Sequence, residues 1–181
     1  MTNGLVVMTP SSIAYSGTSA SINADGSVTF SAITSLSLNG VFTADYDSYM
    51  VAIRHTASSN NNLVLRFRTS GTDATAANYT VQELAANATT ISGSRVTDAN
   101  GFAVIASSNA TQRCGASVYL FGPQLAQPTA FRAVPVNDFS SARILEKAGT
   151  HSLSTSYDGA TFIAWGGPNQ TGLLTVFGFN Q

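Results

Sequence analysis

The stretch Leu63-Val64-Leu65-Arg66-Phe67-Arg68 is the clearest structural signal in the sequence. Side chains alternate between the two faces of a β-strand, so its odd-numbered residues form one wholly apolar face. Its even-numbered residues include both arginines. The stretch therefore predicts a strand with one face in a core and the other in contact with water or another protein.

Similar short segments, rich in β-branched and aromatic residues, lie on both sides of this strand. In residues 49–55, Tyr49, Val51, Ile53 and His55 share one face. Gly, Asn, Asp and Pro separate the segments, as turns require. The other predicted strands cover residues 20–23, 27–33, 79–84, 102–106, 117–121, 131–136, 143–146, 161–165 and 174–179.

About ten strands and no long helix predict an all-β protein, an antiparallel β-sandwich that is jelly-roll-like. Asp25-Gly26 predicts a hairpin with a type I′ turn, which needs positive φ at both central residues. No linker, charge run or internal repeat divides the chain. We expect an N-terminal arm over residues 1–15 and a single β-sandwich domain over residues 16–181.

The composition favours a structural or binding role. The chain has 181 residues, of which 9% are charged, whereas an average soluble domain has about 25%. Neutral polar side chains suit a surface that meets other proteins, because few charges must lose their water on docking. The net charge of −1, with Lys147 as the only lysine, argues against nucleic-acid binding. We expect no signal peptide and no membrane span.

No group of residues predicts catalysis. His55 and His151 have no marked nucleophile or acid beside them, so we expect ordinary structural histidines. Asp45 and Asp47 favour loop capping over a weak Ca²⁺ site. Cys114 is expected in the core. We therefore predict a protein that is not an enzyme, with no catalytic, cofactor-binding or metal-binding residue, although two of the nine acidic residues could still meet in a cleft.

Aromatic residues and arginines suggest binding instead. The aromatic candidates for stacking on sugars are Tyr15, Tyr46, Tyr157 and Trp165. For Trp165, core packing is favoured, because Phe162, Ile163 and Ala164 precede it. The arginines on predicted strands suit pairing at a subunit interface or a solvated sheet face. They are Arg54, Arg66, Arg68 and Arg132.

Two motifs resemble a family of tailed-phage virion proteins that is common in phages of actinobacteria and often labelled minor tail proteins. The first motif is Leu38-Asn39-Gly40-Val41-Phe42 followed by Asp45-Tyr46-Asp47-Ser48-Tyr49. The second runs from Leu63 through Ser70-Gly71 to Asp73, with Tyr79 beyond it. Three later stretches are similar too, so the resemblance spans most of the chain. They are Gln112-Arg113, Tyr119-Leu120-Phe121-Gly122-Pro123 and Gln127-Pro128-Thr129-Ala130-Phe131-Arg132.

The resemblance implies a fold and a particle but transfers no site residue. The resemblance leads to the hypothesis that the chain is a non-enzymatic structural protein on the exterior of a bacteriophage virion, made in the cytoplasm of the bacterial host. We expect a minor tail or adsorption protein that forms a homotrimer and contacts other virion proteins. Two alternatives are a capsid decoration protein that stabilises the head lattice and a carbohydrate-binding module that recognises a host-surface glycan.

Overall fold

A computed structural model describes residues 4–108, 113–136 and 143–180, and this part of the chain contains strands and no helix. All strand pairs are antiparallel. The strands are β1 (Val6–Val7), β2 (Ser12–Ile22), β3 (Val28–Asn39), β4 (Ser48–Ala57), β5 (Asn61–Thr69), β6 (Thr72–Asp73), β7 (Tyr79–Asn87), β8 (Thr90–Ala99), β9 (Phe102–Ser108), β10 (Cys114–Phe121), β11 (Thr129–Val136), β12 (Ile144–His151), β13 (Gly159–Ala164) and β14 (Gln170–Phe179).

Strand β3 belongs to both layers of the molecule. Its first half pairs with β14 from Val28 to Ile33, and its second half pairs with β13 from Ser35 to Leu38. Between the halves Ala32 has a φ of 49°, and the pairing with β2 has a bulge in which Thr34 of β3 is the extra residue. The bend divides one continuous sheet into a large layer and a small layer.

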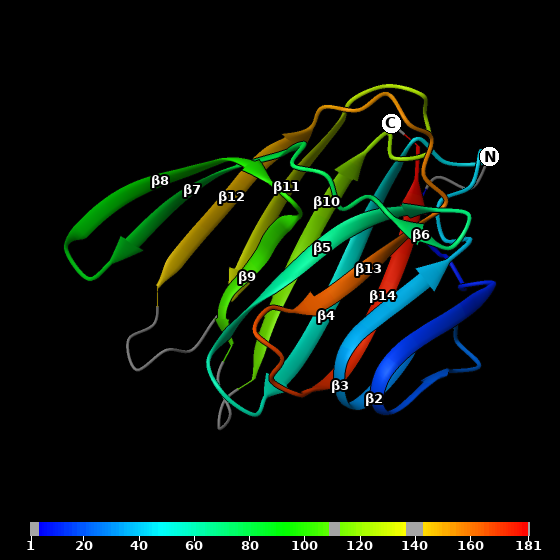
Figure 1. Cartoon of the computed structure of the whole chain (residues 1–181), viewed down its shortest axis with the longest axis horizontal. Coiled ribbons are helices and arrows are strands. Elements are labelled where there is room, and N and C mark those ends of the chain that lie inside the picture. The colour runs from blue at the N-terminus through cyan, green and yellow to red at the C-terminus, as the bar shows by residue number, and fades with distance from the viewer. Residues whose placement is uncertain (1–3, 109–112, 137–142, 181) are drawn as a thin grey trace.

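The large sheet has the order β3, β14, β4, β10, β11, β12, β7, β8, and the small sheet has the order β3, β13, β5, β9. The antiparallel pairs in these sheets are nested, because each pair is enclosed in the sequence by the next one: β5 with β9, β4 with β10, and β3 with β14. Strand β3 also pairs with β13. This is the strand order of a jelly roll. The prediction of an all-β, antiparallel, jelly-roll-like sandwich is confirmed (Figure 1).

The core lies between the two sheets. Phe67 of β5 stacks against Tyr79 of β7 with ring centroids 6.2 Å apart, and Phe102 of β9 stacks against Phe131 of β11 at 3.8 Å. Each fully buried aromatic or aliphatic side chain of this kind stabilises the fold by about 1.5–3 kcal/mol. The predicted inward faces of β4 and β5 are confirmed, and Cys114 is buried as expected.

The turns differ in detail from the prediction. The hairpin between β2 and β3 forms, but only Gly26 of Asp25-Gly26 has a positive φ, so its turn is not type I′. The two-residue turn with positive φ at both positions is Ser70-Gly71, between β5 and β6. That turn needs no glycine at its first position, where Ser70 adopts a φ of 49°.

The N-terminal segment lies against the sandwich. Val6–Val7 pairs with β14, and residues 12–15 form the start of β2. At the other end of the sheet, the hairpin of β7 and β8 extends beyond the two layers (Figure 1). The described residues include no helix with the length and apolarity needed to cross a bilayer.

Candidate binding surfaces

Both histidines are buried in the core. His55 faces inward from β4, and burial lowers its pKa to about 4. His151 of β12 shares a hydrogen bond of 2.6 Å between its Nε2 and the Tyr157 hydroxyl, and burial lowers its pKa to about 4 as well. The His151 ring also packs against the rings of Phe67 and Tyr79. Buried, neutral imidazoles suit the structural role that the sequence predicted.

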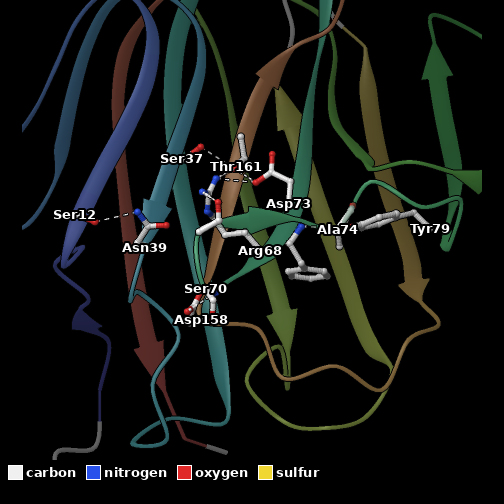
Figure 2. Close-up of polar contacts among 12 residues, drawn as sticks. Ser12, Ser37, Asn39, Arg68, Ser70, Asp73, Ala74, Tyr79, Asp158 and Thr161 are labelled. Carbon is white, nitrogen blue, oxygen red and sulfur yellow. Dashed lines mark hydrogen bonds and ion pairs between the residues drawn. The ribbon is translucent and has the colours of Figure 1, made fainter.

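Arg68 lies at the centre of a buried polar network on the outer side of the small sheet (Figure 2). Its Nη1 donates to Asp73 Oδ1 and to Thr161 Oγ1, both at 2.7 Å, and its Nη2 donates to the Gly71 carbonyl. Thr161 Oγ1 also donates to Asp73 Oδ1 at 2.6 Å and lies 2.9 Å from Ser37 Oγ. Arg68 therefore connects β5, β6 and β13 within the chain. The two predicted positions for this arginine, at a subunit interface or on a solvated sheet face, are both wrong.

The tyrosines of the two sequence motifs hold loops in place. Tyr49 Oη donates to the Thr43 carbonyl at 2.6 Å and accepts from the Thr43 amide at 2.7 Å. Tyr79 Oη donates to the Ala74 carbonyl at 3.0 Å and accepts from the Phe67 amide at 3.1 Å (Figure 2). Burial raises the pKa of both hydroxyls, so they stay protonated donors. In this chain the tyrosines of the two motifs therefore stabilise the fold by fixing the loops beside β4 and β7.

Asp45 and Asp47 lie in the exposed loop before β4. The Asp45 carboxylate accepts a hydrogen bond of 3.3 Å from Thr43 Oγ1, which is the local capping that the sequence favoured. They do not alternate along a strand, because β4 begins only at Ser48. Within the described ranges, no three His, Cys, Asp or Glu side chains group together in a way that would hold a metal ion.

Two of the aromatic candidates for sugar binding differ from the prediction in their burial. Trp165 is 47% exposed, with the Arg66 guanidinium 5.7 Å from the ring centroid, so its predicted core position is wrong. It follows the last residue of β13, whose Ala164 points inward, so alternation turns the indole outward. Tyr157 is buried and not exposed on a loop. Tyr15 is exposed on β2, and Tyr46 packs against the core.

A second buried ion pair lies at the edge of the sandwich. Lys147 Nζ of β12 is 2.6 Å from Glu83 Oε2 of β7, and the lysine side chain is only 4% exposed. Both residues line a hollow of about 200 Å³, together with Val96 of β8 and Ala103 of β9. The pair has no sequence signal, because the two residues lie 64 positions apart (147 − 83) and meet only through the β7–β12 register.

The hairpin of β7 and β8 is the first candidate binding surface. Every residue of β8 from Thr90 to Asp98 is exposed, although the strand is ten residues long and forms the edge of the large sheet. Ile91 and Val96 are 76% and 53% exposed, and Leu84 of β7 is 55% exposed. A long edge strand with apolar side chains and few charges is open to pairing with another chain.

The outer face of the large sheet is the second candidate surface. It carries Arg54 from β4 and Arg132 from β11, which are both exposed on strands as predicted. Arg132 Nε lies 2.6 Å from Glu146 Oε1 on the neighbouring strand. Arg54 lines a separate hollow of about 330 Å³, where the strand pairing also brings Arg113. The sequence gives no hint of this hollow, because its walls come from four separate segments.

Comparison with known proteins gives no family. No family model and no curated protein matches the sequence. Among solved structures, peanut lectin bound to a nine-residue peptide is 7% identical, with 91% of each chain covered and a TM-score of 0.34. The Lotus tetragonolobus seed lectin is 9% identical, with 96% of each chain covered and a TM-score of 0.32.

A protein of unknown function from Shewanella oneidensis MR-1 is 8% identical, with 96% of this chain and 78% of that chain covered and a TM-score of 0.26. These identities and scores are too low to transfer a ligand or an activity. The jelly-roll assignment rests on the nested strand pairs of the chain itself.

Proposed function

We propose that this chain is a non-enzymatic structural component on the exterior of a tailed-bacteriophage particle, of the minor tail or adsorption type. The observation that carries the proposal is the exposed β7–β8 hairpin. A solitary protein gains nothing from a ten-residue edge strand with Ile91 and Val96 in water. A component of an assembly gains a ready contact with its neighbour.

The phage location is supported by the sequence motifs around Tyr49 and Tyr79, which resemble phage virion proteins. The proposal of a non-enzymatic role is supported by the contacts of three buried polar side chains, His151, Arg68 and Lys147. His151 is bonded to Tyr157, Arg68 to Asp73, and Lys147 to Glu83. Each of these groups is committed to a contact within the fold, so none is poised to act on a substrate.

Immunogold electron microscopy on purified virions of the encoding phage tests the proposal. Antibodies raised against the recombinant chain are expected to label the tail or its adsorption end. Label spread over the head would favour the alternative of a capsid decoration protein. Intact particles that carry no label, and no peptide of this chain by mass spectrometry, would refute both virion roles.

One observation favours a carbohydrate-binding module as a second candidate. The Trp165 indole is half exposed and held by Arg66, which leaves an aromatic surface open to a sugar ring. A glycan array of host-wall fragments is expected to show binding that Trp165→Ala abolishes. Binding that is absent, or equal in Trp165→Ala and the wild type, would remove this candidate.

A further inference from the structure

The hollow around Arg54 has the chemistry of an anion site. It has a volume of about 330 Å³, which is within the usual range for small-ligand pockets. Two arginines and four hydroxyl side chains contribute to its walls. These residues are Arg54, Arg113, Thr29, Ser31, Thr56 and Thr171.

The strand register sets the two arginines on the same face. Arg54 of β4 lies opposite Gly115 of β10, and Arg113 lies two positions before Gly115. Arg113 immediately precedes β10, so continued strand alternation makes it the diagonal neighbour of Arg54, and both arginines line the hollow. Such diagonal neighbours are about 7–8 Å apart. Two guanidinium groups can therefore reach one bound group from two sides.

The charges at this hollow are not compensated within the described chain. None of the residues that line it is acidic, and no described carboxylate pairs with Arg54 or Arg113. Arg68, Arg132 and Lys147, in contrast, each have a carboxylate partner within 2.7 Å. Two like charges held close together without a counter-charge favour a bound anion.

The hydroxyl groups suit a sugar. Thr171 Oγ1 accepts a hydrogen bond of 3.0 Å from the Ala32 amide, which leaves its own proton free to be donated. Gly172 lets β14 pack closely against β4 beside the hollow, because a Cβ there would lie 2.1 Å from the Arg54 carbonyl oxygen. Neutral hydroxyls around a charged centre match a polyhydroxylated ligand with one anionic group.

We infer that this hollow binds an anionic glycan, with Arg54 and Arg113 holding a carboxylate or phosphate group and the hydroxyls contacting the sugar. Guanidinium groups bind the oxygens of either anion through paired, charge-assisted hydrogen bonds. Nucleic acid is a poor fit, because two arginines in a chain of net charge −1 provide no extended basic surface along which a phosphate backbone could lie. Such a site does not require that the chain be part of a phage particle.

Isothermal titration calorimetry on the full chain tests the inference with three probes. They are an alginate oligosaccharide for carboxylates, a glycerol phosphate oligomer for phosphates, and a neutral dextran oligomer. We expect one anionic probe to bind and dextran not to bind, and the preferred probe identifies the anion. Arg54→Gln and Arg113→Gln are each expected to weaken binding about tenfold or more, because each removes at least one charge-assisted hydrogen bond to the anion.

Arg132→Gln is the matched control, because this arginine lies on the same face but is already paired with Glu146. It is expected to leave the affinity unchanged. Failure of both anionic probes to bind at about 10 mM would overturn the inference. It would also be overturned if all three variants weakened binding equally, or if a DNA oligonucleotide bound more tightly than the glycans. Matching circular dichroism spectra would show that the variants are folded.

Discussion

The two buried histidines link the stability of the fold to pH. Both have a pKa of about 4 in the folded protein, below the ordinary value of 6.5, because burial disfavours the charged form. The unfolded chain therefore binds more protons than the folded chain between these values. Their stabilising contribution is fully present above pH 6.5 and is lost as the pH falls toward 4.

We predict that the free energy of unfolding falls by up to about 1.4 kcal/mol per pH unit for each histidine over this range. Urea denaturation at several pH values between 7 and 4 measures it. His151→Gln removes one of the two titrations, so the slope of that variant should be visibly smaller. An identical slope in the variant and the wild type would mean that His151 is not buried as described.

The Arg68–Asp73 pair gives a second prediction at this scale. Asp73→Asn leaves the Arg68 guanidinium buried without its counter-charge, so we expect it to destabilise the fold by about 2–4 kcal/mol. Glu146→Gln breaks the exposed pair with Arg132 and should cost at most about 0.5 kcal/mol. Chemical denaturation of both variants compares the costs, and equal costs would contradict the buried network.

Among the structural elements, the bend in β3 is where the two layers of the sandwich separate. Gly17 of β2 faces this bend with a φ of 132°, and a Cβ at its position would lie 2.3 Å from the Ala32 carbonyl oxygen. We predict that Gly17→Ala destabilises the protein by about 3 kcal/mol through steric conflict and backbone strain.

Ala32→Gly is the complementary change at the same bend. Ala32 has a φ of 49°, so glycine relieves strain there and should be neutral or stabilising by up to about 1 kcal/mol. Thermal denaturation of both variants makes the comparison. If Gly17→Ala were neutral while Ala32→Gly destabilised the fold, the bend would not have the described geometry.

Strands with one buried face could be predicted from the sequence, and strands without one could not. The alternation in β4 and β5 marked both strands and their inward residues. Most of β2 and all of β8 were missed, because these strands are exposed along most or all of their length and carry no apolar alternation. Trp165 was misplaced because an apolar run does not show where its strand ends.

The candidate surfaces were less predictable than the fold. Arg54 was predicted to be an exposed strand residue, but its hollow needs β3, β14 and the residue before β10 beside β4. Such neighbours follow from the nested jelly-roll pairing and not from any local motif. The long-range register brings Arg113 and Thr171 to Arg54, and a single sequence contains no record of that register.

At the scale of the whole molecule, low charge and an open sheet edge act together. Only 9% of the residues are charged, and the described hairpin of β7 and β8 exposes Leu84, Ile91 and Val96. A surface with few charges loses little hydration energy when it is covered by protein. The hairpin therefore provides both backbone hydrogen-bonding groups and apolar side chains to a second chain.

We predict that the recombinant protein forms a homotrimer through this hairpin. Light scattering after size-exclusion chromatography should give a mass near three times 18.8 kDa. The double change Ile91→Asp and Val96→Asp should yield a folded monomer, because both side chains are exposed within one chain. Val136→Asp is the matched control: Val136 is 64% exposed but lies on β11, so the trimer should persist. A wild-type monomer would contradict self-assembly through β8 and direct the search to a different virion protein as its partner.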